Sequence, residues 1–226
     1  MKVEIARVAK LDAVECAAME RLYRAYYEGA CAEAFEKDLA EKNFVILLKD
    51  GPSLRGFSTL VVYSFEGMRI LFSGDTVVDV ASRNQVGLAG AFGHVMAHFN
   101  AIPGDPLYWF LICKGARTYR FLPTFFNRFV PGVRAEPELA ARLRRVAAAR
   151  FPREYDPAAG VLRFGEGKDR LREDVLRMDA ESVRFRTMNP GWVKGDELCC
   201  FVPLAMENLN RLGRRVIEVT VPAWRI

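Results

Sequence analysis

The stretch from Phe72 to Asn100 constrains the fold more than any other part of the chain. It begins as a run of β-branched residues, passes through a short polar segment and opens an apolar helix. The first turns of that helix are crowded with small residues, namely Gly87, Ala89, Gly90, Ala91 and Gly93. Because a helix N-terminus leaves backbone N–H groups unpaired, small residues there allow an anion to reach them. The stretch predicts a strand, a turn and a helix that bind phosphate, unless Gly87, Ala89 and Gly90 only let the helix pack closely on the sheet.

Composition sets the broad class of protein. The chain has 226 residues, of which 51% are hydrophobic, and 16 of them are Phe. This is enough to bury a large aromatic core. No window reaches the roughly 18 uninterrupted apolar residues that would span a bilayer. Because the first residues also lack the apolar core of a signal peptide, we expect a cytoplasmic protein.

Cysteines and charges disfavour two further classes of function, zinc proteins and nucleic-acid-binding proteins. The five cysteines are irregularly spaced and match no zinc pattern, so reduced thiols are expected. The net charge of +5 would attract nucleic acid or an anionic cofactor. Lysine and arginine are interleaved with acids, however, and the first half of the chain has no basic block, which disfavours nucleic-acid binding.

Hydrophobic periodicity predicts a mixed α/β domain over residues 1–132. The expected strands are 2–8, 44–49, 55–65, 68–80 and 107–113, and the expected helices are 13–29, 32–42, 87–100 and 116–129, the last interrupted at Pro123. Asp12 and Glu15 have the spacing of a capping box at the first helix. Asp75 follows Gly74 inside a strand, where a bulge is expected. The predicted fold is a mixed central sheet flanked by helices.

Residues 133–226 are richer in charged helical segments and form a predicted extension. We expect it to pack on this core, complete the sheet and shape the acceptor site. Helices are expected at 135–151, 169–178 and 206–212, and strands at 182–188, 197–204 and 214–222. Cys199 and Cys200 are neighbours in one of these strands and point to opposite faces. One buried and one exposed thiol are therefore expected, which disfavours a catalytic cysteine pair.

Three segments carry a resemblance to the GCN5-related N-acetyltransferase superfamily. The opening IARVAKLDA, with Arg7 and Asp12, is similar to the first strand and helix of that family. The segments FVILLKD and RGFSTLVVYSF resemble its central hairpin. The six residues from Asn84 to Ala89 resemble its acyl-CoA signature, in which Gln or Arg stands where this chain has Asn84. The order of predicted elements to about residue 130 agrees with the family.

The resemblance implies how an acyl donor would bind. Acetyl-CoA or a longer acyl-CoA would be the co-substrate, and no metal is expected. Its pyrophosphate would lie on the loop and helix start formed by Asn84, Gln85, Val86, Gly87, Leu88 and Ala89. Its pantetheine arm would lie along Thr76, Val77 and Val78, in a gap between strands 72–80 and 107–113. The acyl group would pass to the amine of a small molecule or an amino acid; the alternative is a non-catalytic ligand sensor or interaction module.

Acylation of an amine needs a base and an acid. Asp75 is the candidate base because a bulge would turn it toward the thioester, and its alternative role is a local carboxylate in the turn. Tyr119 is the candidate acid because the family often places a tyrosine after the buried strand, and its alternative role is a core aromatic. His94 and His98 stand four residues apart on one helix face and could bind a metal together. No third ligand is evident in the sequence, which disfavours a metal site.

Two features suggest a long-chain acyl donor carried by acyl carrier protein. The aromatic residues Tyr108, Trp109, Phe110, Phe121, Phe125, Phe126 and Phe129 are expected in the core, or else they line a tunnel for a long acyl chain. A tunnel would place the chain with the N-acyl amino acid and N-acyl homoserine lactone synthases, which take acyl groups from acyl carrier protein. The arginines that would dock that acidic partner are Arg142, Arg144, Arg145, Arg150, Arg170 and Arg172, which otherwise form a solvated face. A second copy of the chain is a further candidate partner.

Overall fold

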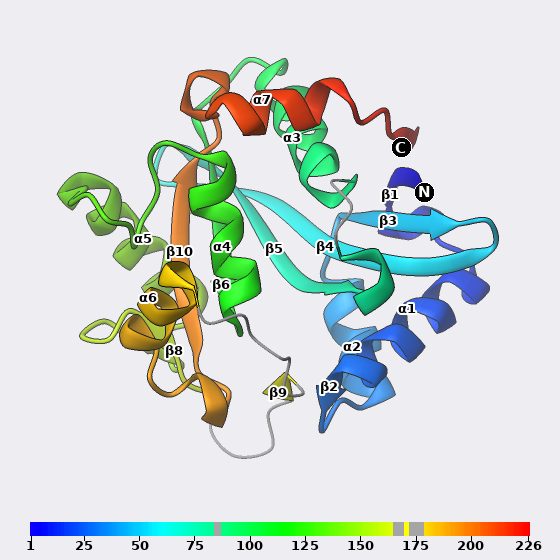
Figure 1. Cartoon of the computed structure of the whole chain (residues 1–226), viewed down its shortest axis with the longest axis horizontal. Helices are drawn as coiled ribbons and strands as arrows, with labels where there is room; N and C mark the ends of the chain where they lie inside the picture. Colours follow the sequence, from blue (N-terminus) through cyan, green and yellow to red (C-terminus); the bar gives the residue numbers. More distant parts are fainter. Residues whose placement is uncertain (84–86, 165–169, 172–178) are drawn as a thin grey trace.

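A mixed β-sheet forms the centre of the molecule and helices cover both of its faces. The computed structural model describes residues 1–83, 87–164, 170–171 and 179–226. Within these residues the main sheet has nine strands in the order β11-β1-β3-β4-β5-β6-β10-β8-β7. Helices α3, α4, α6 and α7 lie on one face, and α1, α2 and α5 lie on the other (Figure 1). The predicted mixed sheet flanked by helices is confirmed.

The first part of the chain follows the predicted order of elements, except that the short strand β2 replaces the end of the helix predicted at 13–29. They are β1 (Lys2–Arg7), α1 (Ala13–Tyr26), β2 (Tyr27–Glu28), α2 (Ala32–Ala40), β3 (Phe44–Asp50), β4 (Ser53–Phe65), β5 (Met68–Val78), α3 (Gly87–Asn100), β6 (Leu107–Cys113) and α4 (Ala116–Phe125). The capping box of Asp12 and Glu15 starts α1. Helix α4 runs through Pro123 without the predicted interruption and ends at Phe125.

The last part of the chain departs from prediction in several elements. They are α5 (Pro137–Arg150), β7 (Tyr155–Asp156), β8 (Val161–Leu162), β9 (Arg170–Leu171), α6 (Ala180–Met188), β10 (Glu197–Pro203), α7 (Arg211–Glu218) and β11 (Ala223–Arg225). The strands predicted at 182–188 and 214–222 are wrong, since helices α6 and α7 occupy them. The helix predicted at 169–178 lies outside the described residues, except for Arg170–Leu171, which pair with β2 as a strand.

Local caps explain why α6 and α7 are helices. The Asp179 carboxylate accepts a hydrogen bond from the backbone N–H of Ser182, and the Asn210 side chain accepts one from that of Gly213. Such caps satisfy donors that a helix start leaves unpaired. Each helix also buries two residues three positions apart, Ser182 with Phe185 and Gly213 with Val216 in α7. That spacing places both residues on one helical face.

The extension adds strands to both edges of the core sheet. Strand β10 pairs antiparallel with β6, and β11 pairs parallel with β1. Because helices cover both faces of β10, Cys199 and Cys200 are both buried. The predicted exposed thiol is therefore wrong. Burial raises the pKa of both thiols, so neither is suited to act as a nucleophile.

Helix α7 packs closely against α3 (Figure 1). A Cβ atom at Gly90 would collide with Thr220, and one at Gly93 would collide with Ile217. His94 of α3 also hydrogen-bonds the Ile217 carbonyl at 3.2 Å. Gly90 and Gly93 of α3 therefore allow close packing against residues 217–220, whereas the alternative to phosphate binding expected close packing on the sheet. Among the described helices, none is both long enough and apolar enough to cross a bilayer.

Candidate active site

The sheet opens at the adjacent strands β5 and β6. The two strands pair in parallel from Arg69 with Leu107 to Ser73 with Leu111, and the pairing stops there. Strand β5 continues to Val78, still paired with β4. Thr59 of β4 faces both Gly74 and Asp75, because the register shifts between Ser58 and Leu60. The predicted bulge at Gly74 and Asp75 is thus present, and it bends β5 where it leaves β6.

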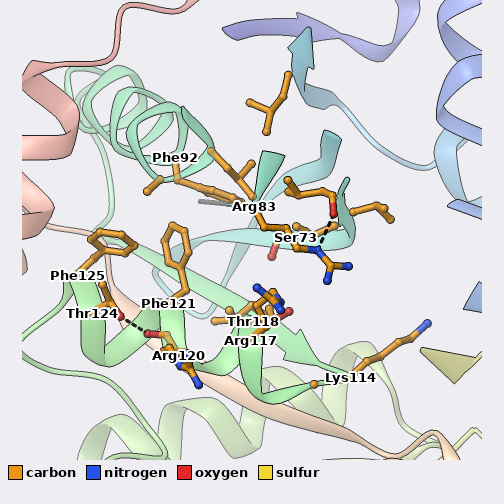
Figure 2. Close-up of a pocket in the computed structure, with 18 of the residues that line it drawn as sticks. Ser73, Arg83, Phe92, Lys114, Arg117, Thr118, Arg120, Phe121, Thr124 and Phe125 are labelled. Atoms are coloured by element: carbon orange, nitrogen blue, oxygen red, sulfur yellow. Dashed lines mark hydrogen bonds between the residues drawn. The ribbon is translucent and has the colours of Figure 1, made fainter. Parts of the chain in front are cut away.

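A cavity of about 330 Å³ lies over this opening on one face of the sheet. It is lined by β5, by the N-terminal half of α3 and by α4, and we call it the α3–α4 cavity (Figure 2). Four cationic residues line it, namely Arg83, Lys114, Arg117 and Arg120. The Nε of Arg83 donates to the Val78 carbonyl at 3.0 Å, and Arg120 forms an ion pair with Asp179 at 2.5 Å. Grouped cations favour binding of an anion here.

Aromatic side chains form the other end of the α3–α4 cavity. Phe92 of α3 and Phe121 and Phe125 of α4 lie on its wall, on the side away from Lys114 (Figure 2). The ring centroids of Phe92 and Trp109 are 4.4 Å apart, and those of Phe121 and Phe125 are 4.7 Å apart. The cavity thus combines a cationic part with an apolar part.

A second cavity of about 370 Å³ lies on the other face of the sheet, and we call it the α2–α5 cavity. Four carboxylate residues line it, namely Asp38, Glu41, Asp75 and Glu197. Two cations, Lys114 and Arg150, also line it. Its wall therefore carries both signs of charge.

The two cavities meet at the opening between β5 and β6. Their walls share Tyr27, Ser73, Thr76, Lys114 and Thr118. The Lys114 ammonium lies 4.5 Å from the centre of the Tyr27 ring, and its Nζ is 3.7 Å from Oε1 of Glu197. Ser73 Oγ accepts a hydrogen bond from Trp109 Nε1 at 2.9 Å. A cation and hydroxyl groups are therefore held where molecules entering from opposite faces would meet.

Residues predicted to bind the donor divide into three groups. Thr76, Val77, Val78, Leu88 and Ala89 all line the α3–α4 cavity. Gly87 is not among its lining residues; a Cβ there would lie 3.2 Å from the Val3 side chain. Asn84, Gln85 and Val86 lie outside the described residues.

The two predicted catalytic residues lie in different surroundings. Asp75 sits on the bulge and lines the α2–α5 cavity. Tyr119 is fully buried, lines neither cavity, and donates its hydroxyl hydrogen to the Pro131 carbonyl at 3.0 Å. Burial raises the pKa of Tyr119. Its place agrees with the alternative role as a core aromatic.

Sequence reasoning did not select several residues that the structure brings to the opening. Lys114, Arg117 and Thr118 come from the segment KGART, and Ser73 and Tyr27 come from distant strands. KGART directly follows a buried strand, and ligands of α/β sheets bind beyond the carboxyl ends of strands. That position was an available signal. Within the described residues, no group of three or more His, Cys, Asp or Glu forms a metal site.

Comparison with known proteins gives structural likeness only. No family model and no curated protein matches the chain. Tetrahymena GCN5 is 10% identical, with a TM-score of 0.44 over 61% of this chain and 84% of that one. An acyl-CoA N-acyltransferase from Pseudomonas aeruginosa is 18% identical, with a TM-score of 0.40 over 60% and 92%.

An aminoglycoside 6'-N-acetyltransferase from Enterococcus faecium is 17% identical, with a TM-score of 0.37 over 47% of this chain and 59% of that one. Because each of these TM-scores is below 0.5, we base the function on the cavities of the chain itself.

Proposed function

We propose that this protein is an N-acyltransferase that moves an acyl group from a coenzyme A thioester to an amine. The observation that carries the proposal is the meeting of two cavities, on opposite faces of the sheet, where β5 and β6 separate. Transfer between two molecules needs both reacting groups in one place and room for the remainder of each. The donor would occupy the α3–α4 cavity and the acceptor the α2–α5 cavity.

The α3–α4 cavity suits the chemistry of coenzyme A. Its phosphates carry several negative charges, and the four cations on the cavity wall are of opposite sign. The pantetheine arm is an extended chain with amides, which can add to a strand edge. The segment Thr76–Val78 offers such an edge because β6 no longer pairs with it. Its carbonyls at Thr76 and Val78 accept hydrogen bonds from side chains, those of Tyr27 and Arg83.

The opening holds groups suited to the reaction. The amine nitrogen would attack the thioester carbonyl, forming the C–N bond as the C–S bond breaks. Asp75 would take the proton that the amine loses. Lys114, placed on both cavity walls, would stabilise negative charge on the carbonyl oxygen and then on the departing thiolate.

Coenzyme A is favoured over a carrier protein as the donor. Of the arginines considered for docking a carrier, Arg145 pairs with Glu66 at 2.7 Å, and Arg142 hydrogen-bonds the Tyr108 hydroxyl. Arg150 lines the α2–α5 cavity. Three of the six arginines are thus engaged within the molecule, and Arg144 is exposed.

Isothermal titration with acetyl-CoA tests donor binding. The double variant Arg83→Ala/Arg117→Ala should weaken acetyl-CoA binding by about 10- to 100-fold. Each hydrogen bond to a charged group contributes roughly 1.5–3 kcal/mol, and the remaining cations of the cavity retain part of the affinity. It should leave use of S-acetyl-N-acetylcysteamine, which lacks phosphates, within about twofold. Arg144→Ala, which removes an exposed cation from α5, is the matched control.

Two outcomes would contradict the proposal. If the double variant binds acetyl-CoA as tightly as the unmodified protein does, the α3–α4 cavity is not the donor site. Tight acetyl-CoA binding without release of coenzyme A, across a broad panel of amines, would instead favour a non-catalytic ligand sensor.

A further inference from the structure

The Arg150 guanidinium is held in an unusual way at the end of α5. It lies over three aromatic rings, at 4.3 Å from the centre of Phe72, 5.3 Å from Tyr63 and 5.6 Å from Phe151. Its Nε is buried and has no hydrogen-bond partner within the described residues. No ion pair of Arg150 is formed within them either. Among the described residues, aromatic faces are what holds this cation.

A cation in this position favours an anionic ligand. Burial removes part of the water that would solvate the guanidinium, and aromatic faces replace only part of that stabilisation. Arg150 also lines the α2–α5 cavity, so a ligand there can reach it. The planar fork of a guanidinium matches the two oxygens of a carboxylate.

The same cavity carries groups that favour an ammonium. Asp75 and Glu41 line it together with Asp38 and Glu197. Asp75 is the carboxylate nearest in sequence to the end of the β5–β6 pairing at Ser73. A ligand with one positive and one negative group therefore finds both counterparts in one cavity.

We propose that the acceptor is an amino acid, whose carboxylate binds Arg150 and whose amino group is directed to Asp75. This inference rests on the proposed function and names the substrate class of its acceptor site. It also gives the extension a role, because Arg150 belongs to α5 while Asp75 belongs to the core sheet. The paired charges would orient the amine toward the opening.

A matched panel of amines tests this pairing. Each amino acid is compared with its primary amide, which keeps the amine and loses the negative charge, and O-phosphoethanolamine represents a phosphate-bearing amine. Release of coenzyme A from acetyl-CoA gives kcat and KM, and a thermal-shift titration without donor gives binding. The variants are Arg150→Gln and Arg150→Lys, with Arg153→Gln as control because Arg153 is exposed and lines neither cavity.

The expected result is selective for the carboxylate. Arg150→Gln should raise KM for amino acids about 10- to 100-fold and change kcat less than about threefold, because a charge-assisted pair is lost in binding. Arg150→Lys should recover part of the loss, since it keeps the charge but not the fork. Both variants should use the amides as the unmodified protein does, and Arg153→Gln should change nothing.

Other results would overturn the inference. One such result is an equal KM for amino acids and their amides. Another is a preference for O-phosphoethanolamine, and a third is that Arg150→Gln raises KM equally for an amino acid and its amide. The thermal-shift titration of amino acids without acetyl-CoA tests the binding site independently of catalysis. If amino acids stabilise the unmodified protein but not Arg150→Gln, the amino-acid site is supported. If no amine is acylated in addition, that second result counts against the proposed acyl transfer and not against the amino-acid site.

Discussion

The two cavities at the opening of the sheet differ in how their walls are built. The α3–α4 cavity is enclosed by β5, α3 and α4, all from residues 1–132, and it pairs cations with aromatic rings. The α2–α5 cavity draws on α2 and β5 but also on Arg150, Phe151, Phe164 and Glu197 from the extension. One wall is thus made by the core alone, and the other by two distant parts of the chain.

This difference separates two kinds of specificity. Cations and a free strand edge recognise the constant part of an acyl donor, which is the same whatever the acceptor. Mixed charges on a wall built partly by the extension can select one acceptor class over another. Changes on one side of the opening should therefore alter one substrate and spare the other.

The largest expected effect comes from Asp75→Asn. Loss of a positioned base lowers kcat by about 10²- to 10⁴-fold. Because Asp75 lines only the α2–α5 cavity, the dissociation constant for acetyl-CoA should stay within about twofold. Steady-state kinetics and isothermal titration on the same variant measure both quantities.

Asp75→Glu provides the control for this substitution, since it keeps a carboxylate at the bulge. Unchanged turnover in Asp75→Asn would assign Asp75 to the local role of a bulge carboxylate. Weakened acetyl-CoA binding in that variant would mean that the two cavities do not divide the substrates between them.

How far the sequence predicts this fold depends on where each element finds its partner. The hairpin strands β3 to β5, the bulge at Gly74 and the capping box of α1 depend on neighbouring residues, and all were predicted. Helix α7 depends on a distant partner, because Ile217 and Thr220 fit against Gly93 and Gly90 of α3. Its β-branched residues favour a strand locally, and tertiary packing overrides that preference.

The same reasoning applies to the candidate site. Thr76, Val77 and Val78 were selected through the resemblance to a known family, and Asp75 was selected because Gly74 before it marks a bulge. Arg150 was considered only as part of a basic helix face. Its three aromatic partners come from β4, β5 and the end of α5, and no sequence pattern places these together. The sequence shows that Arg150 carries a positive charge, but only the tertiary packing determines which side chains surround it.

A smaller effect is expected from Gly74→Ala at the bulge. A Cβ atom there would lie 2.8 Å from Cε of Lys42 and 2.9 Å from Oγ1 of Thr59. Lys42 cannot move away freely, because its side chain is 1% exposed and its Nζ pairs with Asp38. We expect a loss of about 1–3 kcal/mol in the free energy of unfolding, typical of overpacking.

Urea denaturation measures that loss, and kinetics should show reduced turnover with acetyl-CoA affinity unchanged. Gly74 lines the α2–α5 cavity only, which is why donor binding should be spared. A variant as stable as the unmodified protein would show that Lys42 and Thr59 yield easily at the bulge.

The smallest expected effect lies away from both cavities, at Glu15. Burial alone would raise the pKa of this carboxyl, but hydrogen bonds from Arg225 and Lys49, at 2.6 Å and 2.8 Å, and from the Asp12 backbone lower it to about 2. Because the folded pKa lies below the ordinary value of 4.5, the stabilisation is fully present above that pH and is lost as the pH falls toward 2.

Arg225→Met should therefore destabilise the protein at pH 7 by about 1–2 kcal/mol, an amount reduced by the partial exposure of the arginine. The deficit should shrink as the pH falls from 4.5 toward 2, because protonation of Glu15 removes the same interaction from the unmodified protein. Urea denaturation at a series of pH values measures it. Since Glu15 and Arg225 line neither cavity, acetyl-CoA and amine binding at pH 7 should not change. A change in either would show that the edge formed by β1 and β11 is coupled to the opening, and that the two cavities are less independent than their walls indicate.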